Sequence, residues 1–149
     1  MTQIREMKRE DCQEVWNLQK HCFSIPWSME SLESMFQTKG YTSLIALDDQ
    51  RIIGYVGMKA VFDEADITNV AVDLSERRQG IGKALIKELL IIADQQKLNR
   101  IFLEVRMSNE AAIRLYEGVG FKKIDCRKNY YEKPREDAWI MVWENTNSY

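Results

Sequence analysis

The sequence is poor in the residues that several common kinds of site require. It has a single histidine, His21, and only three cysteines, Cys12, Cys22 and Cys126. One histidine argues against a multi-histidine metal site or a histidine-based catalytic triad. The cysteines are odd in number and lack metal-ligand spacing, so reduced thiols in a cytosolic protein explain them most simply.

Long apolar runs, linkers and a positive net charge are missing as well. No run approaches the roughly 20 apolar residues that cross a bilayer, and the first residues, MTQIREMKRED, lack the apolar stretch of a signal peptide. We therefore expect a cytoplasmic protein. Without repeats or a Pro/Gly-rich linker, we expect one domain over residues 1–149. The net charge of −2 argues against general nucleic-acid binding, although Arg77-Arg78 and Lys122-Lys123…Arg127-Lys128 are candidate basic patches.

The spacing of apolar residues predicts alternating helices and strands. Helices are predicted over 10–22, from an N-cap at Ser28 to about 40, over 81–97 and from 109 to 118–120. Strands are predicted over 2–6, 42–47, 51–62, 65–72, 101–105, 121–126 and 138–143. This order predicts a mixed α/β fold with helices on both faces of one sheet.

The most informative segment joins the strand that ends at Val70-Ala71-Val72 to the following helix. It contains Arg77-Arg78-Gln79-Gly80-Ile81-Gly82-Lys83. Backbone N–H groups at a helix start attract anions, glycines let a phosphate approach the backbone, and the cations add positive charge. The alternative is a glycine-tolerant turn with solvated arginines. The strand before the loop and the helix after it favour the phosphate site, although the pattern is neither a Walker nor a dinucleotide-binding motif.

Three polar residues follow this loop. Strand alternation puts Glu104 on one face with Phe102 and Arg106. The glutamate could face solvent, or it could line a cleft, where desolvation would raise its pKa and make it a better base. Asn109 and Tyr116 are two helical turns apart and share a face. Alone, Asn109 is most simply an N-cap and Tyr116 a core aromatic, but beside a phosphate loop the three residues indicate a site.

Taken together, these motifs resemble the GNAT acetyltransferases, whose acetyl-CoA pyrophosphate loop is similar to 77–82. The further matching segments are Phe23-Ser24-Ile25-Pro26-Trp27-Ser28, Leu103-Glu104-Val105-Arg106, Ser108-Asn109, Ala111-Ala112, Leu115-Tyr116, Gly120-Phe121, Arg127-Lys128-Asn129-Tyr130-Tyr131 and Glu136-Asp137-Ala138. Over about residues 3–143 the chain resembles the bacterial ribosomal-protein-alanine N-acetyltransferases, the RimI family.

The resemblance implies a GNAT fold, in which a mostly antiparallel mixed sheet of about seven strands is splayed between its fourth and fifth strands. It implies acetyl-CoA as co-substrate in the gap, and no metal. The backbones of Val70, Ala71 and Val72 would bind the pantetheine arm and thioester. Residues 77–83 would hold the pyrophosphate, and Asn109 would contact the same cofactor. Glu104 matches the family's general base and Tyr116 its general acid.

The resemblance also implies an acceptor, the N-terminal alanine of a small-subunit ribosomal protein. It implies no direct nucleic-acid or membrane partner, and we expect a monomer or weak dimer. We expect direct attack by a neutral amine, because Cys126 has no recognisable histidine partner that would make it a nucleophile. Aromatic residues in loop-like segments could wall a groove for the acceptor, although packing explains Trp27 as well. These are Phe23, Trp27, Tyr130 and Tyr131.

Other functions stay open on the sequence. The acceptor could be a lysine side chain or a small-molecule amine such as a polyamine or aminosugar, for which Asp63-Glu64-Ala65-Asp66 is the candidate acidic stretch. The chain could be a non-catalytic acetyl-CoA-binding module that regulates a partner, which an intact Glu104 and Tyr116 argue against. An RNA-binding role is supported only by the basic patches, and no known RNA-binding motif matches the sequence.

Overall fold

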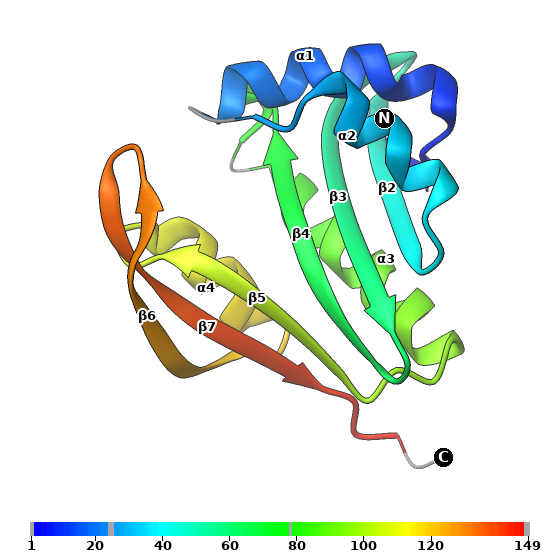
Figure 1. The fold of residues 1–149 in the computed structure, drawn as a ribbon. Helices are drawn as coiled ribbons and strands as arrows, with labels where there is room; N and C mark the ends of the chain where they lie inside the picture. The colour runs from blue at the N-terminus through cyan, green and yellow to red at the C-terminus, as the bar shows by residue number, and fades with distance from the viewer. Residues whose placement is uncertain (1, 24–25, 78, 148–149) are drawn as a thin grey trace.

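A computed structural model describes residues 2–23, 26–77 and 79–147. The strands in these ranges are β1 (Thr2–Glu6), β2 (Tyr41–Asp48), β3 (Arg51–Val61), β4 (Glu64–Val72), β5 (Arg100–Arg106), β6 (Lys122–Glu132) and β7 (Arg135–Glu144). The α-helices are α1 (Cys12–Cys22), α2 (Met29–Ser34), α3 (Ile81–Gln95) and α4 (Glu110–Gly118), with 3-10 turns η1 (Arg9–Asp11), η2 (Met35–Gln37) and η3 (Leu74–Glu76). Each helix and strand predicted from the sequence is present (Figure 1).

The hairpin formed by β6 and β7 is longer than predicted. The predicted strands, 121–126 and 138–143, cover only the part of the hairpin next to the core. Strand β6 continues to Glu132, and β7 already begins at Arg135. The pairing of Tyr131 with Glu136 belongs to this extension. Its side chains are mostly polar and exposed, so no apolar alternation marks it as a strand in the sequence.

The second helix begins as predicted but ends early. The Ser28 hydroxyl accepts a hydrogen bond from the Ser31 N–H at 3.0 Å, which confirms the N-cap. The helix stops at Ser34 and a 3-10 turn follows, instead of a helix to about residue 40. Gly40 then adopts a φ of +96°, and a Cβ there would collide with the Ala60 carbonyl oxygen, so the chain turns into β2 at a position that requires glycine.

The seven strands form one sheet in the order β1-β2-β3-β4-β5-β7-β6. Neighbouring strands are antiparallel except for β4 and β5, which run parallel. Their pairing covers only residues 64–66 with 100–102, and beyond it the two strands diverge (Figure 1). The splay expected between the fourth and fifth strands is therefore confirmed. It leaves the edge of β4 at residues 67–72 without a paired strand on the β5 side, within the described part of the chain.

Helices cover both faces of the sheet, as predicted. On one face, α1 and α2 pack around Val15, Leu32 and Tyr55, whose side chains are fully buried. On the other face, α3 and α4 pack around a core that includes Leu85 and Leu89 (Figure 1). We refer to these as the α1/α2 face and the α3/α4 face. No described helix has the length and apolar character needed to span a membrane.

Replacing Leu89 with alanine should lower the free energy of unfolding by about 2–5 kcal/mol, because the side chain is fully buried and its removal leaves a cavity. Ile91 on the same helix is 53% exposed and provides a matched control. Ile91→Ala should change the stability by only about 0.5 kcal/mol. Urea denaturation measures both variants. Equal losses at the two positions would contradict the packing described for α3.

Candidate active site

A cleft of about 1270 Å³ opens where β4 and β5 diverge. It extends from the connection between α1 and α2 to the start of α3, to α4 and to the tip of the β6–β7 hairpin. The predicted site residues that line it are Phe23, Trp27, Val70, Val72, Arg77, Gly80, Ile81, Gly82, Lys83, Glu104, Asn109, Tyr116, Tyr130 and Tyr131. Folding thus brings segments from most of the chain into a single cavity.

Two of the predicted residues that the structure describes, Ala71 and Gln79, are not among those that line the cleft. The Ala71 side chain is 2% exposed and belongs to the core of the α1/α2 face, so only its backbone faces the free edge of β4. Gln79 is exposed and is not among the lining residues. Arg78 lies outside the described residues, as do Ser24 and Ile25 of the segment before α2.

The two glycines at the start of α3 have different structural requirements. Gly80 is the N-cap in the left-handed region, with a φ of +79°, and among the described residues no atom beyond its chain neighbours lies within 4 Å of the position of its missing Cβ. Gly82 is buried, and a Cβ there would lie 2.9 Å from Leu115 Cδ1 on α4. The first N–H groups of a helix have no partner within that helix, so this turn presents backbone donors and the exposed Lys83 to the cleft.

The carbonyl of Val72 at the end of β4 already accepts two hydrogen bonds. The Cys22 thiol donates to it at 3.3 Å, and Arg77 Nε donates at 3.3 Å. A carbonyl oxygen has two lone pairs, so this carbonyl is occupied. A ligand that uses it must displace one of these donors. The free edge at residues 67–71 is therefore the more accessible part of β4.

Glu104 lies inside the cleft. Ile101, Leu103 and Val105 are buried in the core of the α3/α4 face, so alternation along β5 puts Glu104 on the α1/α2 face. Of the two environments considered from the sequence, the structure supports the cleft, and the side chain is half-buried there. Burial raises the pKa of the Glu104 carboxyl; the negative charge of Asp66 raises it further, whereas Arg127 lowers it.

The acidic stretch at 63–66 does not form a dense anionic pocket. Asp63 accepts a hydrogen bond from Asn99 Nδ2 at 2.6 Å, and Glu64 forms a 3.1 Å ion pair with Arg100. Asp66 is the residue of this stretch that acts on the Glu104 carboxyl. The structure therefore gives little support to an acceptor that carries several positive charges.

Asn109 and Tyr116 reach the cleft from α4. Asn109 is the N-cap, and its Oδ1 accepts a hydrogen bond from the Ala112 N–H at 3.2 Å. Its Nδ2 group is then the part that can donate to a ligand. Tyr116 is 9% exposed and packs on Phe121 at 5.9 Å between ring centroids. Burial raises the pKa of the Tyr116 hydroxyl, so it remains a hydrogen-bond donor well above neutral pH.

Aromatic side chains wall the cleft on two sides. Phe23 and Trp27 lie between α1 and α2, and both are partly buried against the core of the α1/α2 face, so Trp27 contributes to packing and to the cleft. Tyr130 and Tyr131 come from the hairpin and stack edge to face at 5.0 Å. The Arg106 guanidinium lies 4.3 Å from the centre of the Tyr131 ring.

Arg106 ties the hairpin to β5, a role that the sequence analysis missed. Its Nη1 donates to the Pro134 carbonyl at 2.8 Å and to Glu136 at 3.3 Å. Glu136 also accepts a hydrogen bond from the Ser108 N–H at 2.6 Å, just before α4. Both Arg106 and Glu136 belong to segments that carry the family resemblance, and this is the feature of the sequence that could have indicated their role.

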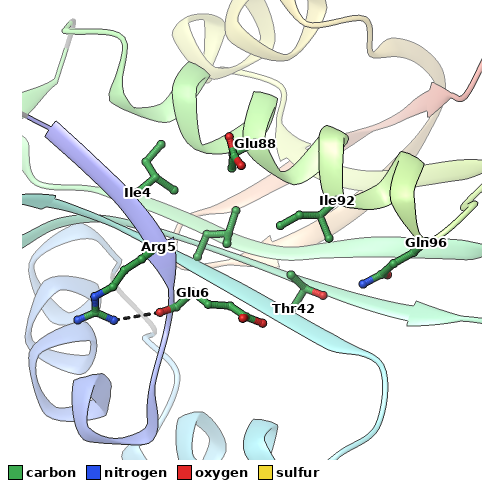
Figure 2. Close-up of a pocket in the computed structure, with 8 residues that line it drawn as sticks. Ile4, Arg5, Glu6, Thr42, Glu88, Ile92 and Gln96 are labelled. Carbon is green, nitrogen blue, oxygen red and sulfur yellow. Dashed lines mark hydrogen bonds between the residues drawn. The ribbon is translucent and has the colours of Figure 1, made fainter.

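A smaller hollow of about 310 Å³ lies between β1, β2 and α3 (Figure 2). It contains none of the predicted site residues. Arg5 at its rim is already engaged, because it donates to the Glu6 carbonyl at 2.9 Å and to Asp11 at 2.9 and 3.1 Å. The large cleft is therefore the candidate active site.

If the cleft binds CoA, as the family resemblance implies, Gly82→Ala should weaken that binding at least several-fold, because the new methyl group would press on Leu115 and move α4 relative to the start of α3. Gly118→Ala on α4 is the control, since a Cβ there meets no atom within 4 Å. Calorimetric titration with CoA measures both variants. Unchanged affinity in a folded Gly82→Ala protein would show that this contact does not matter for the site.

The fold and the cleft define the class of protein. A splayed mixed sheet with a glycine-containing helix start at the gap is the architecture that the resemblance to the GNAT acetyltransferases implies. The family model described as Acetyltransferase (GNAT) family matches residues 12–121. The chain belongs to the GNAT family of acetyltransferases, whose members use acetyl-CoA.

Individual relatives agree with this assignment. The ribosomal protein bS18-alanine N-acetyltransferase of Escherichia coli is 34% identical over 144 residues, covering 95% of this chain and 97% of the relative. The enzyme of the same name from Haemophilus influenzae is 33% identical over 145 residues, covering 95% and 98%. The crystal structure of the Escherichia coli ribosomal-protein-S18-alanine N-acetyltransferase has a TM-score of 0.90 at 32% identity, covering 100% of this chain and 99% of that chain.

Proposed function

We propose that this protein transfers the acetyl group of acetyl-CoA to the N-terminal α-amine of a protein that begins with alanine. The observation that best supports the proposal is the position of two residues on opposite sides of the diverging strands. Glu104 lies on the α1/α2 face and Tyr116 belongs to the core of the α3/α4 face. An acceptor amine that enters from the α1/α2 face would meet Glu104 as its base. A CoA thiolate that leaves toward the α3/α4 face would meet the Tyr116 hydroxyl as a hydrogen-bond donor.

The cleft fits the parts of acetyl-CoA. The start of α3 suits the diphosphate, because Gly80 leaves open space and Lys83 adds a positive charge. The free edge of β4 at Val70 and Ala71 suits an extended arm that carries amides, because its backbone groups have no paired strand on that side. Asn109 would donate to the same ligand with its Nδ2 group.

The chain's own residues divide the chemical work. Acetyl-CoA supplies a thioester carbonyl, and the neutral amine attacks its carbon. Glu104 accepts the proton that the amine loses, directly or through a water. N–H groups on the free edge of β4 would stabilise the oxyanion. Tyr116 would donate a hydrogen bond to the departing sulfur.

An α-amine suits this base better than a lysine side chain does. Freeing the lone pair of an α-amine at pH 7 costs about 1 kcal/mol, whereas a lysine side chain costs about 4.6 kcal/mol. A single carboxylate with a raised pKa is a strong enough base to deprotonate an α-amine. The α1/α2 face of the cleft, with Phe23, Trp27, Tyr130 and Tyr131 along its walls, would receive the first residues of the acceptor.

The named relatives support a ribosomal acceptor. Two of them act on the alanine of ribosomal protein bS18, and they match this chain over nearly its whole length. We infer that the acceptor here is also a small-subunit ribosomal protein. We further propose that the chain acts as one domain in the cytoplasm, as a monomer or weak dimer, without a metal and without direct contact with nucleic acid or membrane.

A peptide panel tests the proposal. The protein is incubated with acetyl-CoA and with peptides that begin with alanine, with other residues, or with a blocked terminus, each carrying an internal lysine. We expect mass spectrometry to locate the acetyl group on the free α-amine, with alanine preferred. Acetylation confined to lysine side chains, or seen equally on the blocked peptide, would overturn the N-terminal assignment.

A further inference from the structure

Three buried polar atoms near the acceptor side of the cleft have no hydrogen-bond partner among the described residues. They are Gln19 Nε2, Thr68 Oγ1 and Asn69 Oδ1. Gln19, on α1, is completely buried, whereas Thr68 and Asn69, on β4, line the cleft. Buried polar atoms are rarely left unpaired in folded proteins, so this group requires an explanation.

A backbone N–H group fixes the orientation of both amide side chains. The Trp27 N–H can only donate, and it donates to Gln19 Oε1 at 3.2 Å. Asn69 Nδ2 donates to the same oxygen at 3.5 Å. Asn69 must therefore turn its NH₂ group toward Gln19 and its Oδ1 away from it. The unpaired oxygen is a consequence of this chain of contacts.

An irregularity in β4 brings Thr68 and Asn69 to the same side of the sheet. Gly57 of β3 pairs with Asn69 and Met58 pairs with Ile67, so Thr68 is an extra residue between them. A Cβ on Gly57 would lie 2.8 Å from Thr68 Oγ1, so the hydroxyl occupies the space beside that glycine on the α1/α2 face. Bulges commonly redirect side chains next to active sites, and this one directs two polar groups toward the face of Glu104.

The unpaired Asn69 Oδ1 can only accept, so it calls for a ligand that donates an N–H group, whereas the Thr68 hydroxyl can donate or accept. We propose that Asn69 Oδ1 accepts a hydrogen bond from the acceptor α-amine, and that Gln19 is the positioning residue that orients Asn69 for this contact. The inference rests on the proposed function and adds the groups that hold the nucleophile. A primary amine has the hydrogens that the site needs, one for Glu104 and one for Asn69.

The proton balance distinguishes the two hydrogens. The amine nitrogen forms a bond to the acetyl carbon, and the carbon–sulfur bond breaks. One amine proton goes to Glu104, and the thiolate is stabilised by Tyr116. The other hydrogen stays on the nitrogen and becomes the N–H of the product amide. Asn69 holds this retained hydrogen, so an N-methylated terminus, which has one hydrogen fewer, cannot satisfy both residues.

The test compares two acceptor peptides that differ only by an N-methyl group on the first alanine. We expect the wild-type protein to prefer the primary amine in kcat/KM by roughly tenfold or more, because a site built for a donor rejects an analogue that lacks it. In Asn69→Ala this ratio should fall to about threefold or less, since no acceptor remains for the missing hydrogen. Asn69→Leu, which keeps a larger side chain, should behave in the same way and serves if the alanine variant does not fold.

Changes at Gln19 separate the orientation of Asn69 from general damage. Gln19→Glu keeps an oxygen for Trp27 and Asn69, so the preference for the primary amine should persist. Gln19→Leu removes that oxygen and should lower the ratio as Asn69→Ala does, although Asn69 itself is unchanged. Asn17→Ala, at an exposed amide on the same helix, is the control and should leave the ratio unchanged.

Two outcomes would overturn the inference in different ways. A wild-type ratio that persists in an active Asn69→Ala protein would overturn the role of Asn69 and leave the proposed function intact. Wild-type protein that binds CoA but acetylates neither peptide would remove the proposed function and this inference with it.

Discussion

Replacing Glu104 with glutamine should lower kcat by roughly 100- to 10,000-fold, the usual contribution of a general base. Glutamine has nearly the same shape but cannot accept the proton that the attacking amine must lose. Packing should be preserved, because Ile101, Leu103 and Val105 on the other face of β5 hold the strand in the core. Steady-state kinetics with an alanine-initiated peptide measures the loss, and CoA titration checks that the cofactor side is intact.

Glu117→Gln, at an exposed position on α4, is the matched control and should leave kcat nearly unchanged. If both variants were equally active, Glu104 would have no part in proton transfer, and a water or the acceptor itself would have to act as the base.

The activity of the wild-type enzyme should fall on the acidic side at a pH above the usual range for a glutamate. Under the proposed function Glu104 acts as the base only when it is deprotonated, and burial and the charge of Asp66 both raise its pKa. Protonation of Glu104 as the pH falls through that raised pKa therefore adds to the loss of activity that protonation of the acceptor amine, with a pKa of about 8, already causes. Asp66→Asn should move this limb of the profile to lower pH, and Arg127→Gln should move it to higher pH. A limb that moves in the same direction in both variants would contradict this account.

Tyr116→Phe should lower kcat by roughly 100-fold while leaving the affinity for CoA almost unchanged. The phenylalanine keeps the ring that packs on Phe121 and removes only the hydroxyl, which under the proposed function would lie beside the departing sulfur. A thiol has a pKa near 8.5 and an ordinary tyrosine one near 10, so full proton transfer is uphill by roughly 2 kcal/mol. Burial raises the pKa of Tyr116 and widens that gap. We therefore expect the hydroxyl to stabilise the thiolate as a hydrogen-bond donor.

Tyr41→Phe provides the comparison, because Tyr41 lies on β2, away from the cleft, and should tolerate the change. The raised pKa has a second consequence: ionisation of Tyr116 should not produce a loss of wild-type activity up to about pH 10. Near-normal kcat in Tyr116→Phe would remove the hydroxyl from the chemistry.

Local patterns explain the parts of the molecule that the sequence predicted well. The strand before residue 72, the glycine turn and the helix after it could be identified because turn residues and apolar spacing act over a few positions. From the sequence, Glu104 could either face solvent or line a cleft. Strand alternation assigns the side chain to one face of the sheet, but it does not say which other residues cover that face. The splay between β4 and β5 depends on how many residues of the two strands remain paired, which no local pattern reports. It was predicted only because the family resemblance implies it.

The parts that were missed depend on contacts between distant residues. Gln19 and Asn69 are 50 positions apart, and neither is unusual in its own segment. Arg106 and Glu136 meet only because the β6–β7 hairpin folds over the end of β5. The hairpin extension itself carries polar side chains, so its strands are defined by backbone pairing that a side-chain pattern does not report.

The divergence of β4 from β5 gives this sheet, within the described residues, an unpaired strand edge in its interior as well as at its rims. Exposed strand edges commonly recruit another extended chain, and proteins usually protect them at the periphery. Here the exposed edge lies within the sheet and lines the cleft. Under the proposed function, the acetyl donor would fill that position as a temporary extra strand, so each catalytic cycle would complete the sheet and open it again.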